Sequence, residues 1–172
     1  MMFALLWFAL VCCGAGCATT PLPGDRLLPE ARPADFTLGL TVLGPQRGIR
    51  RPGQTPARYL VGADGWLRVA VGPGARESVH PSLTRRLTGA ERDLLWALTR
   101  SAGIETVGPP LRIESPESFN PPAGRRVYLV QFRGHERTIS LAMPEGEPGT
   151  EPFAALGDRL ARWAWIADPD RP

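Results

Sequence analysis

The chain has 172 residues, of which 43% are hydrophobic and 22% are charged. These values are ordinary for a soluble globular protein, so they exclude a polytopic membrane protein and a wholly disordered chain, and the length suits one domain. All twenty basic residues are arginines, and the formal net charge of +3 is too small to indicate nucleic-acid binding.

The first sixteen residues carry no charge and contain an apolar run that ends on small residues. The run FALLWFALVCC covers residues 3–13, which is too short to span a bilayer and typical of a signal-peptide core. It is followed by Gly14, Ala15, Gly16 and Cys17. Small residues that lead to a cysteine in this position resemble the lipobox of bacterial lipoproteins.

The resemblance implies that residues 1–16 are a signal peptide and that Cys17 carries a diacylglyceryl thioether. Cleavage before Cys17 and acylation of the new N-terminus are also implied. The alternatives are a plain secretory signal and a buried N-terminal helix. Because Cys12 and Cys13 precede the cleavage point, the mature chain keeps only the cysteine used by the lipid, and no disulfide, zinc site or cysteine nucleophile is expected.

Residues 17–34 are predicted to form the lipidated cysteine and a Pro-rich tether, since four prolines lie between Ala18 and Ala34. Pro-rich linkers extend by about 3.1 Å per residue, so this one reaches up to about 50 Å. A single domain is expected over residues 35–168, with a short tail over residues 169–172.

The domain opens with a period-two alternation, which marks a strand with one buried face. The apolar positions are Phe36, Leu38, Leu40 and Val42, and they alternate with Thr37, Gly39 and Thr41. Two further runs, 58–61 and 66–71, flank Asp64-Gly65. This pair predicts a hairpin with a primed turn, whose two central residues need a positive φ.

A helix is predicted after a long loop over residues 72–87. Thr88 and Glu91 form a capping box at its start, and Gly103 can take the left-handed position at its end. The apolar stripe at helical spacing is Leu94, Leu95, Leu98 and Ala102. Trp66 and Trp96 fall off the main apolar faces, so partial burial at the core edge is expected for both.

A second long loop over residues 106–124 leads to another hairpin, from runs at 127–130 and 138–143, with His135 at its tip. The last predicted element is a helix that ends near Ile166. Its apolar residues, at spacings of three and four, are Phe153, Leu156, Leu160, Trp163 and Ala164.

The expected fold class is α+β, an antiparallel sheet of about five strands with two helices on one face, in the order β-ββ-α-ββ-α. The body resembles uncharacterised small-domain lipoproteins and secreted proteins of GC-rich bacteria, through Asp64-Gly65, the Leu-Thr-x-x-Glu helix start at residues 87–91 and the Gly-Ile helix end. That resemblance implies no known activity.

The sequence offers little for catalysis. It holds no Gly-x-Ser-x-Gly nucleophile elbow, its two histidines, His80 and His135, lie in a loop and at a hairpin tip, and no residues show metal-ligand spacing. No catalytic residue, metal ligand or cofactor is therefore predicted.

Arginine clusters are the remaining candidates for binding. Arg47, Arg50 and Arg51 share one loop, and Arg85 and Arg86 lie in another. If these loops meet at one end of the sheet, they form an anion-binding patch for a polyanion. The alternative is that these arginines are simply solvated.

The predicted function is a lipid-anchored envelope protein, a non-enzymatic binding or structural module on the periplasmic side of the cell membrane or outer membrane. Its expected partners are the membrane, reached through the N-terminal lipid, and an envelope protein or polyanion, with no nucleic acid. Two alternatives remain open. One is a small hydrolase of an envelope polymer with His80 or His135 as base, and the other is a polyanion-binding domain that uses the arginine loops.

Overall fold

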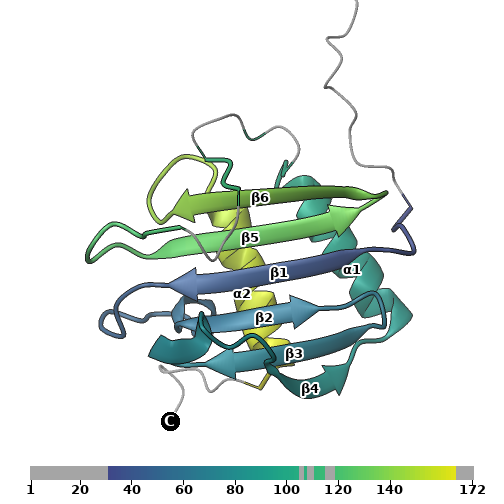
Figure 1. The fold of residues 1–172 in the computed structure, drawn as a ribbon, viewed down its shortest axis with the longest axis horizontal. Helices are drawn as coiled ribbons and strands as arrows, with labels where there is room; N and C mark the ends of the chain where they lie inside the picture. The colour runs from purple at the N-terminus through teal and green to yellow at the C-terminus, as the bar shows by residue number, and fades with distance from the viewer. Residues whose placement is uncertain (1–30, 105–106, 108–110, 115–118, 166–172) are drawn as a thin grey trace, which may run out of the picture.

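A computed structural model describes residues 31–104, 107, 111–114 and 119–165. It contains a six-stranded antiparallel sheet in the order β4-β3-β2-β1-β5-β6, with both helices on one face (Figure 1). The strands are β1 (Thr37–Leu43), β2 (Ala57–Val61), β3 (Trp66–Val71), β4 (Ser82–Arg86), β5 (Val127–Gly134) and β6 (Arg137–Pro144). The helices are α1 (Gly89–Ser101) and α2 (Glu151–Trp163), with 3-10 turns η1 (Pro52–Gln54) and η2 (Pro73–Ala75). The predicted α+β class is confirmed.

The sixth strand, β4, lies in the segment that was predicted to be a loop over residues 72–87. Its sequence, SLTRR, has no apolar face, and Leu83 is 59% exposed. This segment is therefore a strand because its backbone pairs with β3. A register shift interrupts that pairing between Leu67 and Arg68 of β3. A polar edge strand with an irregular ladder is a common way to avoid pairing with other chains.

The central strand β1 joins the two hairpins. Leu38 pairs with Val61 of β2 on one side and with Phe132 of β5 on the other. The predicted alternation is confirmed, since Phe36, Leu38, Leu40 and Val42 are each at most 1% exposed. Their side chains, with those of neighbouring strands, form the core beneath the helices.

The β2–β3 hairpin turns at Asp64-Gly65, as predicted, but the turn is of another type. The Gly65 amide donates to the Gly62 carbonyl (2.9 Å) and the Gly62 amide to the Trp66 carbonyl (3.1 Å). Only Gly65 in this loop has a positive φ, at 80°. The loop is thus a three-residue connection closed by a left-handed glycine, in place of a primed turn.

The β5–β6 hairpin turns through two non-glycine residues in the left-handed region, His135 (φ 51°) and Glu136 (φ 62°). The Asp35 carboxylate accepts hydrogen bonds from both of their amides, at 3.0 and 2.9 Å. Bonds from the Glu136 and His135 amides lower the pKa of Asp35. This contact stabilises a turn in which two non-glycine residues adopt an energetically unfavourable left-handed conformation. It also connects the start of the domain to the β5–β6 hairpin.

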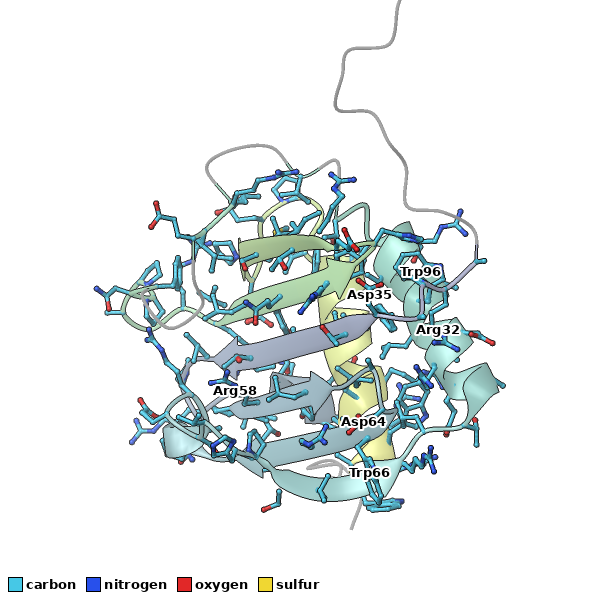
Figure 2. The ribbon with its side chains drawn as sticks, turned by 45° about the vertical axis from the view of Figure 1, so that its right-hand side comes forward. Arg32, Asp35, Arg58, Asp64, Trp66 and Trp96 are labelled. Carbon is cyan, nitrogen blue, oxygen red and sulfur yellow. The ribbon has the colours of Figure 1, made fainter. Side chains whose placement is uncertain are left out.

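The last residues of the predicted tether lie against the domain. Arg32 Nε is 2.8 Å from Asp93 Oδ1 of α1, and the Pro33 carbonyl accepts from the Phe36 amide at 3.2 Å. Figure 2 shows Arg32 beside α1 and Asp35 at the same end of the sheet.

Helix α1 begins as predicted, since Thr88 and Glu91 form both hydrogen bonds of a capping box. Its buried face differs from the predicted stripe: Leu94 is 41% exposed, whereas Trp96 is only 2% exposed. Trp96 packs edge-on against Phe36 (centroids 5.3 Å apart) and stacks on Phe132 (5.7 Å). The expectation that Trp96 lies at the core edge is therefore wrong. No helix within the described parts of the chain combines the length and apolar character that crossing a bilayer requires.

Helix α2 packs closely on η1 through two glycines. A Cβ at Gly53 would overlap the backbone nitrogen of Asp158, and a Cβ at Gly157 would come within 3.1 Å of the Gly53 carbonyl oxygen. The Gly53 amide donates to Asp158 Oδ1 at 3.0 Å. Close backbone approach therefore explains the glycine at both positions.

A polar cluster, which we define as Gln54, Arg126, Glu145 and Asp158, holds η1 in this place. Arg126 Nη1 donates to Glu145 Oε2 (2.8 Å) and Arg126 Nε to the Gln54 carbonyl (2.9 Å). Gln54 Nε2 donates to Glu145 Oε1 at 2.7 Å. Because Arg126 is only 6% exposed, these hydrogen bonds satisfy a charge that is costly to bury alone.

The only two tyrosines of the chain, Tyr59 and Tyr128, are fully buried in the core. Neither hydroxyl has a hydrogen-bond partner among the described residues. Burial, with the negative charge of Glu145, raises the pKa of Tyr128 to about 12. Burial and the charge of Asp158 also raise the pKa of Tyr59.

We expect Gly53→Ala to lower the free energy of unfolding by about 1–3 kcal/mol, because the added methyl must displace the α2 backbone. Urea unfolding measures the change. Gly74→Ala is the matched control: its Cβ would meet only Glu77 Oε2 at 3.9 Å, so a change within about 1 kcal/mol is expected. Equal effects of the two substitutions would contradict the close approach.

We expect the native protein to resist ionisation of tyrosine up to alkaline unfolding. The pKa of Tyr128 is about 12 in the folded state and 10.0 ordinarily, so its contribution to stability is complete below pH 10.0 and is lost as the pH rises toward 12. Absorbance of tyrosinate measures this directly, since Tyr59 and Tyr128 are the only two tyrosines of the chain. In the urea-unfolded chain, the tyrosines should titrate near pH 10.0. If the tyrosines of the native chain also titrate near pH 10.0 while its circular dichroism is unchanged, the burial of the two hydroxyls is refuted.

Candidate functional site

The face of the sheet opposite the helices, which we call the open face, is turned toward the viewer in Figure 1. Part of it is covered. Ile113 and Phe119 pack on a small apolar cluster of Val127, Leu129 and Ala142. The segment that contains Ile113 also pairs with β6, through an isolated bridge between Arg112 and Leu141.

Residues 72–81 cover another part of the open face. Arg58 of β2 donates to the Arg76 carbonyl (2.9 Å), and Arg76 donates to the Phe119 carbonyl (2.6 Å). These bonds join the two covering segments. Arg58 lies toward the other end of the sheet from Asp64 and Trp66 (Figure 2).

The remainder of the open face holds a groove of about 540 Å³. Side chains from β1, β2, β3, β5 and β6 line it, together with residues 79–81. Its polar lining comprises Thr37, Arg68, His80, Gln131, Arg133 and Thr138. Its apolar lining includes Leu60, Val79 and Pro81. We call this feature the open-face groove.

Gly39 gives the open-face groove its depth. It pairs with Leu60 on one side and Gln131 on the other, in regular register with both strands. Its φ is not in the left-handed region, and a Cβ there would lie 3.3 Å from Leu60 Cδ2 and 3.6 Å from Gln131 Cβ. A glycine inside a strand weakens it and often marks a close approach. Here no bulge or turn requires the glycine. The Leu60 side chain lies close beside it, and the open-face groove reaches down to the Gly39 backbone at this point, which forms a hollow.

The lining of the open-face groove contains arginine and histidine but no carboxylate. Arg68 Nη2 lies 2.7 Å from Asp64 Oδ2, and this hydrogen bond lowers the pKa of Asp64. Arg133 is exposed, and its side chain makes no hydrogen bond or ion pair with another described residue. The groove therefore offers one arginine whose charge is balanced and one whose charge is available to an anionic ligand.

The structure places the predicted anion-binding arginines at opposite ends of the sheet. Arg86 pairs with Trp66 of β3, at the end of the sheet where β1 starts, whereas Arg47 and Arg50 follow the end of β1. Arg51 lies 3.4 Å from Asp158, and Arg85 lies 2.6 Å from Glu91. The five arginines are not brought together, and none of them lines the open-face groove. The reason is that Arg47, Arg50 and Arg51 lie in the β1–β2 connection, at one end of the strands, whereas Arg85 and Arg86 close β4 at the other end.

Cys17, the predicted lipidation site, lies outside the described residues. His80 lies on the wall of the open-face groove, and His135 lies in the β5–β6 turn. The hydrolase alternative needs a histidine in hydrogen-bond contact with Ser, Asp or Glu, and neither imidazole makes such a bond with another described residue. Among the described residues, no three His, Cys, Asp or Glu side chains gather closely enough to hold a metal ion.

The groove residues Gly39, Gln131, Arg133 and Thr138 were not singled out from the sequence. The one available signal is the strand at residues 36–42, in which Gly39 interrupts the threonines of the polar face. Gln131 and Arg133 belong to β5, which joins β1 only through long-range pairing, and Thr138 belongs to β6, which pairs with β5. A periodicity does not reveal either pairing.

No protein-family model matches the chain, and no curated protein or solved structure matches it either. The function is therefore inferred from the open-face groove and from the N-terminal motif, because the fold class alone does not specify a function.

Proposed function

We propose that this protein is a lipid-anchored envelope protein whose folded domain is a non-enzymatic binding module, with the open-face groove as its ligand site. The observation that carries the proposal is the groove itself, about 540 Å³ in volume and lined by polar and cationic side chains without a carboxylate. Ligand pockets commonly measure about 300–1,000 Å³ and hold a few polar groups beside apolar ones. The groove has both properties.

The anchor is the diacylglyceryl thioether on Cys17, exposed once residues 1–16 are removed. It places the domain on the periplasmic side of the cell membrane or outer membrane. The end of the tether supports a link between anchor and groove: Arg32 and Pro33 contact the domain, and Thr37, a few residues later, lines the groove. The groove therefore lies at the end of the sheet where the tether enters.

The anchor is tested by feeding cells an alkyne fatty acid and isolating the full chain. We expect the wild-type chain to carry the label and to lose residues 1–16, and Cys17→Ser to carry none, because the acyl chains are attached through that sulfur and its new amino group. Globomycin should leave a larger precursor. Unlabelled protein in the cytosol with residues 1–16 intact would refute the anchor.

The ligand site is tested in cells by photo-crosslinking. Thr138→p-benzoylphenylalanine places a crosslinker on the groove, and Arg162→p-benzoylphenylalanine places one on the exposed side of α2 in the opposite layer. We expect a discrete adduct from position 138 and none from position 162, and Gly39→Thr in the same chain should abolish the first, because its side chain fills the hollow. Adducts of equal yield from both positions, or none from position 138, would refute the groove as ligand site.

A further inference from the structure

The open-face groove runs across the strands. The register aligns Arg68 of β3 with Leu60, Gly39 and Gln131 in one row of the sheet. Arg133 lies two residues further along β5. Because neighbouring strands lie about 4.8 Å apart and residues rise about 3.4 Å along a strand, Arg68 and Arg133 are separated by about 16 Å between their backbones.

The two arginines therefore mark the two ends of an elongated site. Arg68 already holds Asp64, and a guanidinium has five N–H donors, so it can also receive a second carboxylate. Arg133 has no such partner among the described residues. An elongated ligand with an anionic group at each end therefore meets both arginines. The carboxylate at Arg133 contributes more of the binding, because no ion pair there has to be shared.

The middle of the groove suits a peptide. Leu60 and the 72%-exposed Val79 offer apolar contact, while the amide of Gln131 and the hydroxyl of Thr37 can both donate and accept hydrogen bonds. An extended peptide offers every second side chain to the surface that it lies on, together with the amide and carbonyl groups of its backbone, which matches this mixture. No aromatic side chain lines the groove, so the stacking surface that usually holds a sugar ring is missing from its lining.

We propose that the open-face groove binds an extended acidic segment of a partner protein, with two carboxylates four residues apart, on one face of that segment, that pair with Arg68 and Arg133. Residues four apart point to the same face of an extended chain and lie about 13 Å apart, and the long arginine side chains cover the difference from their backbone separation of about 16 Å. This inference rests on the proposed function, in which the groove is the ligand site, and adds the chemistry of the ligand.

The test uses the full lipidated chain in neutral detergent and a fluorescein-labelled peptide, acetyl-Asp-Ala-Val-Ala-Asp-amide, whose two aspartates and central valine share one face of the extended chain. Binding is followed by fluorescence anisotropy. We expect saturable binding that weakens several-fold when salt is raised, because salt screens charge pairs at an exposed site. The same peptide with lysine in place of aspartate should not bind.

Variants locate the binding. Arg133→Gln should weaken it by about tenfold, since it removes a charge-assisted hydrogen bond. Gly39→Thr should weaken it at least as much by filling the hollow. Circular dichroism should show that this variant stays folded, because the nearest neighbour of the added Cβ, at 3.3 Å, is the flexible end of the Leu60 side chain. Arg162→Gln, on the opposite layer, is the matched control and should bind as the wild type does.

Three results would overturn the inference: no saturable binding of the aspartate peptide, equal binding of the lysine peptide, or displacement by glycerol phosphate with no dependence on the peptide sequence, which would assign the groove to a phosphate. These failures are distinguishable from failure of the proposed function. If the crosslinker at position 138 still forms its adduct, the groove remains a ligand site and only the acidic-peptide chemistry is wrong.

Discussion

The pairing of β1 with both hairpins is the constraint on which the rest of the structure depends. Since successive side chains in a strand point to opposite faces, one register decides two outcomes at once: Leu38 and Leu40 enter the core, and Thr37 and Gly39 form the floor of the open-face groove. A shift by one residue would exchange the two faces. The packing of the core between the helices and the sheet thus also fixes the position of the open-face groove on the opposite face of the sheet.

Side-chain hydrogen bonds to the backbone fix β1 at both ends. Before the strand, Asp35 accepts from the amides of the β5–β6 turn, and beyond it, the buried Arg126 donates to the Pro45 carbonyl (3.3 Å) and to that of Gln54 (2.9 Å). Each of these bonds joins segments that are distant in the sequence, so they complement the strand pairing itself. A sheet held in this way presents its groove residues in one arrangement, which lowers the entropic cost of binding a ligand.

Elements with local signals could be predicted from the sequence, and those that depend on pairing could not. Thr88 and Glu91 identify the start of α1 because the capping box is made within four residues, and the alternation around Leu38 identifies β1 because its buried face is continuous. Strand β4 has no apolar face, so only its pairing with β3 makes it a strand. The burial of Trp96 depends on Phe36 and Phe132, which lie outside its helix. The open-face groove was harder to predict than these elements, because Gly39 and Arg133 lie on two strands, β1 and β5, that come together only through long-range pairing.

An open sheet face that only met water would be expected to carry polar side chains at every outward position. Gly39 does not fit that expectation, since a strand-interior glycine costs about 0.5–1 kcal/mol relative to alanine and its backbone here needs no positive φ. The covering segments hide Val127 and Leu129 elsewhere on the same face, whereas Leu60 and Val79 stay uncovered in the groove. What remains open combines a hollow, an arginine without an ion-pair partner among the described residues and a lining free of carboxylates. A solvated face requires none of these three features, whereas a site for an anionic ligand uses all of them.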